Sequence, residues 1–507
     1  MGETLKILII GAGVCGPALA TLLRNAEETP TEITIIDRSP SLRTGGQQID
    51  FRAQGIPILR KMGLLNAMRS RAVPETGIAM VDRTGKVRAA FPMTEKGENE
   101  DKQSLTSEYE LMRGDIVEVF YRASLGLDVN VKGGEECEKK VGESQSKASK
   151  VRYEFGISVT SLINTEDGSA VEVTFADGRT LSYDLVIGAD GQGSRTRAAV
   201  MGSEEASKAC FRTLNLFTAF YNIPRRSDDL DMALAYALAR RRSVLLRAAN
   251  KDRPAQVYLS FMPSKAADKK KKQQANAVED EKRKDSGLSI DDKEKELDGI
   301  RPGESDYDYF HRVLGGRSTE AQKQLFVSKF ADTDAWRVPE FTSYLKPKTE
   351  DSSSSSDFDT DFYATEIGQV HCPKLSNGRI VLLGDAGYTP SPITGMGTTL
   401  SLTGAWILAG ELSSKENRAS KSGGVDVLDA LRAYETKVRP YIKKGQELPP
   451  GTPGIIYPES AWAIWLIAAL VWISSKMSPV LMFLLQFVPS FGKPMVVPEY
   501  PELRLGD

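Results

Sequence analysis

Residues 6–24 read KILIIGAGVCGPALATLLR, and this stretch decides the fold of the chain. The apolar, partly β-branched run at residues 7–10 predicts a buried parallel strand, and the apolar residues after the glycines predict a helix. Between them, Gly11, Gly13 and Gly16 have the spacing G-x-G-x-x-G. In such a turn the first glycine permits the bend, the second admits a pyrophosphate, and the third lets the helix pack on the strand. The pattern therefore indicates a dinucleotide site.

A second β-branched strand is expected at residues 32–36, and it ends in Asp37. An acid at this point of a βαβ unit is expected to contact ribose hydroxyls. Glycine-rich turns are common, so the glycine pattern alone could mark a plain strand–turn–helix. Because the strand, the helix and the acid all stand in the expected places, we predict an α/β, Rossmann-like domain that binds a dinucleotide.

Length and composition limit the possible functions. A chain of 507 residues suggests two or three domains, and a formal net charge of −2 gives no reason to expect a nucleic-acid partner. Four scattered cysteines and two histidines argue against a disulfide framework or a metal site, and they favour a reducing, cytoplasmic compartment. The first apolar run leads straight into the glycine turn, so we expect no secretory signal.

A second strand and glycine-rich turn occur at residues 184–197, DLVIGADGQGSRTR. Asp190 and Gly191 follow the short buried strand, and Ser194 is expected to cap the helix after the turn. The tight glycine-rich turn favours a ligand contact at Asp190 and Gly191, although a plain strand–turn–helix remains an alternative.

A third such signal occurs at residues 380–405, IVLLGDAGYTPSPITGMGTTLSLTGA. Gly384 and Asp385 follow a buried strand, at the place where open α/β sheets bind ligands. The helix after them is expected to begin with small residues, Gly395, Gly397 and Thr398. Free N–H groups at such a helix start can bind an anion or a carbonyl.

Two other stretches allow two interpretations each. Residues 45–52, GGQQIDFR, are either a turn into a short strand or a segment in which Gln48 and Arg52 contact a flat ligand. Arg113 is either a solvated helix residue or a phosphate contact at a helix start.

The remaining pattern predicts a second, mixed-sheet domain. A hairpin is expected from residues 78–82 and 87–91, and a hairpin does not belong to a pure βαβ series. Helices are expected at residues 55–69 and 109–125. A helix is also a possible interpretation of residues 232–242, between the β-rich stretches of the mixed sheet.

The C-terminal region is unusually apolar. Residues 461–473 are thirteen apolar residues, Lys476 and Pro479 interrupt the run, and residues 480–488 resume it. Packed helices or a dimer surface, contact with a membrane surface through residues 461–488, and a true membrane span all remain open. We favour packing on the protein, which would bury the tryptophans of this segment, Trp462, Trp465 and Trp472.

The three motifs in this order resemble the group A flavin monooxygenases, the para-hydroxybenzoate hydroxylase-like family, including its tetracycline-inactivating branch and fungal relatives. In that family the first motif binds the ADP part of FAD, which implies this role for Gly11–Gly16 and Asp37. The second motif lies near FAD and the path of NADPH, which implies this place for Asp190–Gly191. The third contacts the ribityl and pyrophosphate parts, which implies that role for Gly384–Asp385. Arg113 corresponds to the family's arginine on the long helix.

The resemblance also implies an activity. FAD would be bound without a covalent link, NADPH would reduce it, and O₂ would supply one oxygen atom to a small aromatic or polyketide-like metabolite. Baeyer–Villiger oxygenation or epoxidation, and a flavin-binding scaffold without turnover, remain alternatives. No nucleophile–base pair is evident, so we assign no catalytic residue. Gln48, Gly395, Gly397 and Thr398 complete the candidate cofactor residues, and Thr399 stands where the family usually has asparagine.

On this basis the chain divides into segments of two interleaved domains and a C-terminal region. The FAD-binding domain comprises residues 1–75, 108–208 and 362–445, and the substrate domain comprises residues 76–107 and 209–345. Polar inserts are expected near residues 132–150 and 265–299, a low-complexity loop at 346–361, and apolar helices at 446–507.

Overall fold

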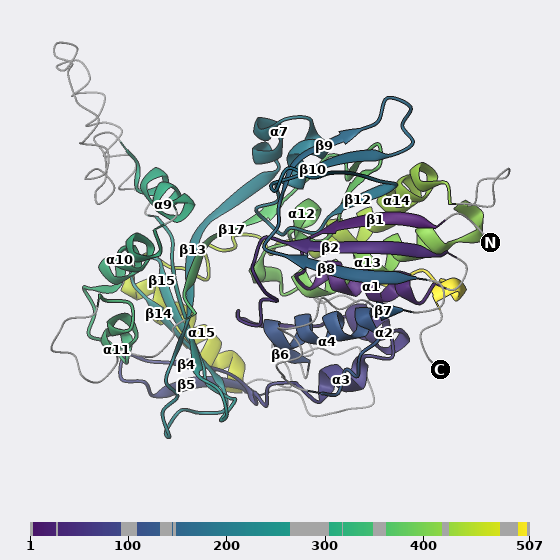
Figure 1. The fold of residues 1–507 in the computed structure, drawn as a ribbon. Helices are drawn as coiled ribbons and strands as arrows, with labels where there is room; N and C mark the ends of the chain where they lie inside the picture. Colours follow the sequence, from purple (N-terminus) through teal and green to yellow (C-terminus); the bar gives the residue numbers. More distant parts are fainter. Residues whose placement is uncertain are drawn as a thin grey trace, which may run out of the picture.

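Two seven-stranded sheets organise the molecule (Figure 1). The computed structural model describes residues 4–26, 29–92, 109–131, 144–145, 149–263, 304–316, 318–347, 361–417, 425–476 and 495–503. The predicted insert near residues 265–299 lies outside these residues, as do most residues of the segments predicted near 132–150 and at 346–361.

The first sheet is mainly parallel and contains the strand predicted at the start of the chain. Its order is β18 (Ser376–Asn377), β19 (Ile380–Leu382), β12 (Leu185–Gly188), β1 (Leu5–Ile10), β2 (Thr31–Asp37), β8 (Lys150–Phe155) and β7 (Ser144–Gln145). β1 runs parallel to both β12 and β2, so the strands of all three predicted motifs lie side by side in this sheet, with β19 next to β12. Ile7, Leu8 and Ile9 are fully buried, as expected for a parallel strand covered on both faces.

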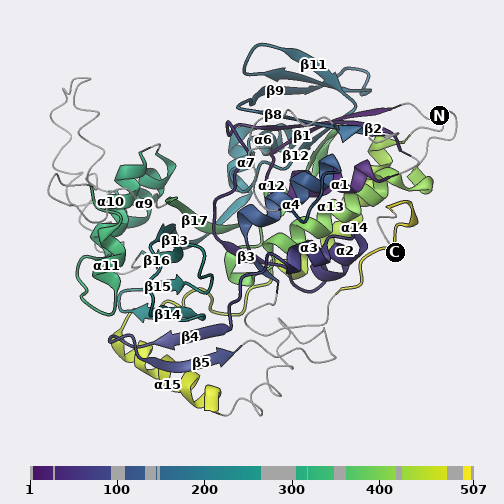
Figure 2. The same cartoon turned by 60° about the horizontal axis from the view of Figure 1, so that its bottom comes forward.

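Helices cover one face of this sheet and a small antiparallel sheet lies on the other (Figure 2). The covering helices are α1 (Cys15–Arg24), α4 (Arg113–Leu125) and α13 (Gly397–Ser413), with α14 (Val427–Gly445) packed on α13. The small sheet consists of β9 (Val159–Asn164), β10 (Val171–Phe175) and β11 (Thr180–Tyr183). The first sheet with these helices and the small sheet is called the first half of the molecule, and the second sheet with its helices is called the second half. The first half also contains short elements: β3 (Gln48–Asp50), β6 (Glu110–Met112), α2 (Gly55–Lys61), α3 (Leu65–Arg69), α6 (Thr196–Met201), α7 (Glu204–Ala209) and α12 (Asp385–Tyr388).

The second sheet is mixed, which confirms the predicted fold class. Its order is β17 (Tyr363–Val370), β13 (Phe211–Ile223), β16 (Ala255–Phe261), β15 (Arg242–Arg247), β14 (Ala233–Leu238), β4 (Gly77–Val81) and β5 (Val87–Pro92). β4 and β5 form the predicted hairpin, and β4 also pairs with β14 in parallel. The outer face packs on α9 (Asp306–Gly315), α10 (Thr319–Phe330) and α11 (Val338–Ser343), on the side away from the parallel sheet (Figure 2).

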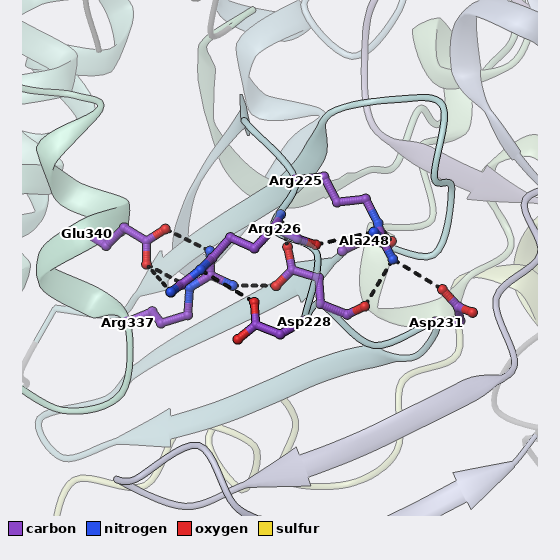
Figure 3. A network of polar contacts seen from close by, with 8 residues as sticks. Arg225, Arg226, Asp228, Asp231, Ala248, Arg337 and Glu340 are labelled. Carbon is purple, nitrogen blue, oxygen red and sulfur yellow. Dashed lines mark hydrogen bonds and ion pairs between the residues drawn. The ribbon is translucent and has the colours of Figure 1, made fainter. Parts of the chain in front are cut away.

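Ion pairs join the loop after β13 to α11 at the edge of this half (Figure 3). Arg226 lies 3.2 Å from the Glu340 carboxylate, and Arg337 lies 2.7 Å from the same group. Arg225 lies 3.3 Å from Asp231. Hydrogen bonds from Arg337, and then its charge and that of Arg226, hold the pKa of Glu340 below its usual value. The pair of Arg226 with Glu340 links α11 to the loop after β13, and the pair of Arg225 with Asp231 lies within that loop, outside the candidate site described below.

Two predicted helices differ from the observed elements. The helix expected at residues 55–69 is two helices, α2 and α3, because Gly63 has a φ of +68° and breaks the helical path. The helix expected at residues 109–125 begins only at Arg113, since the residues before it pair with β3 as strand β6.

The prediction of a helix at residues 232–242 was wrong. These residues form β14, a turn and the first residue of β15. Leu234 and Leu238 alternate with alanines and face the core, so strand pairing on both sides outweighs the local helical tendency. Arg240 and Arg241 occupy the turn with φ values of 61° and 59°.

The C-terminal region crosses from one half of the molecule to the other. After α14 the chain reaches the second sheet, where α15 (Ala461–Lys476) packs against β5 and β14. Residues 495–503 return to the first half, where the Trp406 indole donates to the Pro498 carbonyl at 2.9 Å and the Tyr441 hydroxyl donates to Val496. The C-terminal region therefore connects the two halves.

The expectation that the tryptophans of this region are buried was wrong. Trp462, Trp465 and Trp472 are 69%, 66% and 50% exposed. One side of α15 packs on the sheet, but a single helix lying on a sheet edge leaves its other side uncovered. No helix in the described part of the chain is long and apolar enough to cross a membrane.

Candidate cofactor and substrate site

The glycine turn after β1 is closely packed at two of its three glycines. Gly11 has a φ of +118°, and a Cβ atom on it would lie 2.4 Å from the carbonyl oxygen of Ala189. A Cβ atom on Gly16 would lie 2.2 Å from the carbonyl oxygen of Gly11. Gly11 therefore brings the first turn directly against the second motif, and Gly16 lets the start of α1 pack against the turn itself.

The second glycine of the turn is different because it borders open space. A Cβ atom on Gly13 would meet only the guanidinium of Arg113, at 3.4 Å, and one on Gly397 would meet nothing within 4 Å. Gly191 also has no neighbour within 4 Å of its Cβ position, but its φ of +80° would strain any other residue. Open space therefore borders one glycine of each motif. The space beside Gly13 and Arg113, called the gap below, fits the close approach of a pyrophosphate to the backbone.

Arg113 lies beside Gly13, and Asp385 lies near enough to Arg113 for their charges to affect each other's pKa. Arg113 is the first residue of α4 and Asp385 is the first residue of α12. In the described part of the chain, the Arg113 guanidinium makes no ion pair within 4 Å, and burial followed by the positive charge of Arg43 lowers its pKa. Burial raises the pKa of Asp385 to about 6, against the opposing effect of Arg113. A half-buried cation without an ion-pair partner beside Gly13 suits a phosphate ligand.

The third motif packs on the first. Gly384 has a φ of +64°, and a Cβ atom on it would lie 3.0 Å from both Cys15 Sγ and Ser401 Oγ. The Cys15 thiol donates to the Ser401 carbonyl at 3.4 Å, and burial holds the pKa of this thiol far above its usual value. Cys15 is therefore a neutral packing residue that holds α1 against α13.

Asp37 shapes the glycine turn from the end of β2. Its carboxylate accepts the Ala12 N–H at 3.0 Å and the Ser39 N–H at 2.8 Å. Arg43 lies 3.6 Å from the same carboxylate. The structure therefore places Asp37 beside the turn, and its contact with the ribose hydroxyls stays a prediction.

Asp190 has a more local role than its motif suggests. Its carboxylate accepts the backbone N–H groups of Arg195 at 2.8 Å and Thr196 at 3.1 Å, and the Ser194 hydroxyl at 2.6 Å. Ser194 in turn accepts the Arg197 N–H at 3.0 Å, so the predicted capping role of Ser194 is confirmed. The Asp190 side chain is thus engaged at the start of α6, and Gly191 is the member of the pair that borders open space.

The start of α13 brings the small residues of the third motif to the gap. Gly395, with a φ of +62°, precedes the helix, and Gly397 and Thr398 are its first two residues. Thr399, the position where asparagine is usual in the resembling family, is fully buried. Its hydroxyl accepts the Arg52 N–H at 2.8 Å and lies 3.0 Å from the Arg52 carbonyl. Thr399 therefore fixes the segment after β3 against the start of α13.

Gln48 joins the two halves of the molecule. Its N–H donates to the side chain of Gln256 at 3.0 Å, and its side-chain amide donates to Glu110. Glu110 also pairs with Arg247 of β15, whose guanidinium lies 2.7 Å from Glu75. The structural interpretation of Gln48 is thus favoured, because its side chain belongs to this buried cluster.

Sequence reasoning missed an aromatic group on the inner face of the second sheet, which is the face opposite the one that packs on α9, α10 and α11. Phe220 stacks on Tyr363 with ring centroids 4.9 Å apart, and its ring meets Tyr258 edge-on at 4.8 Å. Strand register places the three residues in one row, because Phe220 is opposite both tyrosines. The Tyr258 hydroxyl accepts the Gln48 N–H at 3.2 Å and the Tyr363 hydroxyl donates to Gln47. The row therefore faces the first half of the molecule.

An apolar cluster continues this inner face toward the third motif. Its members come from β13 and β17, the residue after β16, the turn before α13 and the C-terminal region: Leu214, Leu216, Met262, Ile367, Ile393 and Tyr457. Burial raises the pKa of Tyr457 and of Tyr363, so both phenols are neutral donors or acceptors near pH 7. Within the described residues, no group of three His, Cys, Asp or Glu side chains could hold a metal ion.

The sequence also matches a known family over more than half of its length. A model of the FAD binding domain matches residues 4–304. The chain belongs to the group A FAD-dependent monooxygenases. It is therefore a flavoprotein and an oxidoreductase, and its cofactor is FAD, as the resemblance of the motifs implied.

Two fungal monooxygenases are similar in sequence to this chain over nearly its whole length. The FAD-dependent monooxygenase asL6 of Sarocladium schorii is 32% identical, over 99% of this chain and 99% of the relative. The flavin-dependent monooxygenase eupH of a Phoma species is 29% identical, over 92% of this chain and 91% of the relative. The similarity thus includes the second sheet and the C-terminal region.

Solved structures share the fold at lower identity. The tetracycline destructase Tet(51) is 21% identical with a TM-score of 0.62, over 99% of this chain and 100% of the other. A variant of HpxO from Klebsiella pneumoniae, complexed with FAD, is 16% identical with a TM-score of 0.57, over 96% and 99% of the two chains. These likenesses confirm the two-sheet architecture.

Proposed function

We propose that this monooxygenase uses NADPH and O₂ to hydroxylate a small aromatic or polyketide-like metabolite in secondary metabolism. The observation that carries the proposal is the row of Phe220, Tyr258 and Tyr363, which faces the gap between the motifs together with an apolar cluster. Aromatic rings and aliphatic side chains bind flat, apolar molecules well. The similarity to fungal monooxygenases supports the role in secondary metabolism.

We infer that FAD lies in the gap between Gly13, Arg113 and the start of α13. The open space at Gly13 and Gly397 supports a pyrophosphate near the backbone, and Arg113 would supply a positive charge to it. Gly395 and Thr398 would lie close to the same group. Asp37 would contact the adenosine end and Asp385 the ribityl end, as the family resemblance implies. We assign Gln48 and Asp190 positioning roles, since their side chains are engaged with the protein.

When bound, FAD would supply the redox chemistry: NADPH would provide a hydride, one oxygen atom of O₂ would go to the substrate, and the other would leave as water. The protein residues orient the substrate and exclude water. Phe220, Tyr363 and the apolar cluster would hold a flat substrate on the inner face of the second sheet. Burial raises the pKa of Tyr363, so its hydroxyl keeps its proton, donates a hydrogen bond to Gln47 and adds no charge to the reaction space. A dry site limits the unproductive release of H₂O₂.

The test is a turnover assay with isotopically labelled oxygen. Purified protein should be yellow and should release FAD, and not FMN, on denaturation. With NADPH, ¹⁸O₂ and a panel of phenolic and polyketide substrates, we expect a product that carries one labelled hydroxyl oxygen. A labelled ring-expanded ester would instead indicate Baeyer–Villiger oxygenation, and a labelled epoxide would indicate epoxidation. FAD-loaded protein that never consumes NADPH, with or without substrates, would contradict the enzyme function itself.

A further inference from the structure

Among its described side chains, the exposed side of α15 carries large apolar residues and no ionisable group. Its exposed large residues are Trp462, Trp465, Leu466, Leu470, Trp472 and Ile473. Steps of three, four and seven residues place most of them on one side of the helix. The outward side of a surface helix normally carries polar or charged residues. In α15, only the last residue, Lys476, is ionisable.

The protein holds this helix with its apolar side outward. The other side packs against β5 and β14. The Arg240 N–H donates to the Glu459 carbonyl at 2.9 Å, and the Arg241 N–H donates to the Pro458 carbonyl at 3.2 Å, so the segment before the helix is fixed to the β14–β15 turn. The Ser460 hydroxyl accepts the Ala463 N–H at 3.2 Å. The orientation of α15 is therefore determined by backbone contacts at its start and by packing along its length (Figure 2).

We propose that α15 rests on a lipid surface and attaches the enzyme to membranes as a peripheral protein. Indole rings have an apolar body and one N–H donor, and they gather where hydrocarbon meets water. A helix of 16 residues is about 24 Å long, shorter than the roughly 30 Å hydrocarbon core, so it would lie along the surface. An isolated helix at a membrane surface turns a polar face to the water. In α15 the side away from the lipid packs on the second sheet instead, so this helix needs no polar face.

A protein partner would fit this surface less well. Protein interfaces surround an apolar centre with polar, hydrogen-bonding residues. On the exposed side of α15, the hydrogen-bonding groups of the described side chains are the indole N–H groups alone. A lipid surface needs no more than these. The proposal does not depend on the substrate or on the type of oxygenation.

The test is vesicle binding by the FAD-loaded full chain. We expect it to sediment with phosphatidylcholine vesicles, and brominated lipid should quench part of its tryptophan fluorescence. The double substitution Trp462→Ser and Trp465→Ser should lower the vesicle partition coefficient at least about tenfold, since two large apolar side chains no longer leave water. Trp406 is 2% exposed and should remain unquenched in both proteins.

A matched control separates lipid contact from general surface polarity. Ile163 and Val496 are exposed apolar residues outside α15, so Ile163→Ser with Val496→Ser should leave vesicle binding unchanged. Unchanged FAD content and Tm in each variant would show that the fold is intact. Full-length protein that stays in the supernatant, or binding that survives loss of both tryptophans, would overturn the proposal. A dimer in solution that the tryptophan substitutions dissociate, without any vesicle binding, would assign the surface to a second copy instead.

Discussion

The two faces of the second sheet are formed by the same strands, but the outer face is a packed core and the inner face borders the proposed substrate site. On the outer face, Phe217 and Phe261 stack with centroids 5.6 Å apart, and Phe310 and Phe326 from the covering helices meet Phe261 at 4.9 and 5.2 Å. On the inner face, Phe220 and its two tyrosines contact polar groups of the first half. Because neighbouring residues of a strand point to opposite faces, one short stretch supplies both a sealed core and a reaction surface.

The largest expected effect is on the outer face. Phe261→Ala should lower the free energy of unfolding by about 3–5 kcal/mol, since it leaves a cavity among three phenylalanine rings. Urea denaturation of FAD-loaded protein measures this change. The milder Phe261→Leu should remain folded and keep its substrate affinity and product ratio. A loss below about 1 kcal/mol for the alanine variant would contradict the packed outer face.

A second test concerns the carboxylate of Asp385 in the third motif. Asp385→Asn should weaken FAD binding by about 1–3 kcal/mol, the range for a lost hydrogen bond to a charged group. Fluorescence titration of FAD-free protein measures the affinity. Asp332→Asn, a carboxylate paired with Arg242 far from the motifs, is a control in which FAD affinity should not change. Equal affinities for all three proteins would remove Asp385 from the cofactor site.

The same carboxylate predicts a dependence of stability on pH. Burial raises the pKa of Asp385 to about 6 in the folded protein, above its unfolded value near 3.9. The folded state therefore holds this proton more tightly, and the resulting stabilisation is present below about pH 4 and is lost as the pH rises through 6. FAD-free wild-type protein should lose about 1–3 kcal/mol relative to Asp385→Asn between pH 4 and 7. Parallel pH profiles of the two proteins, measured by urea unfolding, would exclude this titration.

The smallest expected effect compares two tyrosines on opposite faces. Tyr221 on the outer face donates to the Phe341 carbonyl at 3.0 Å, and Tyr258 on the inner face accepts the Gln48 N–H at 3.2 Å. Each Tyr→Phe substitution should cost about 0.5–1.5 kcal/mol of unfolding free energy. Only Tyr258→Phe should also change kcat/KM, since it alone borders the reaction space. Equal kinetic effects of the two substitutions would show that the faces are not functionally distinct.

The comparison also explains what the sequence could predict. The glycine turn with Gly11, Gly13 and Gly16 was found because its strand, turn and helix are contiguous in the sequence, so that the spacing of the glycines alone indicates it. The aromatic row was missed because Phe220, Tyr258 and Tyr363 meet only through strand register. No local pattern reveals which residues of distant strands lie opposite each other.

Two other differences have local causes. Asp190 stands in a motif that predicts a ligand contact, yet its carboxylate accepts the backbone N–H groups of Arg195 and Thr196 at the start of α6, the helix that follows. The apolar run at α15 was expected to be buried, but the protein offers the helix only one surface to pack on. Apolar composition therefore predicted the helix without predicting which of its sides is covered.

The most direct test of the account is the fraction of consumed NADPH that is recovered as H₂O₂, compared between Phe220→Ala and Phe261→Leu. The account predicts that the fraction rises in the inner-face variant, because a gap opens beside the substrate, and stays at the wild-type value in the folded outer-face variant. Equal H₂O₂ fractions in the two variants and the wild type would contradict the claim that the inner face of the second sheet is where the oxygen transfer takes place.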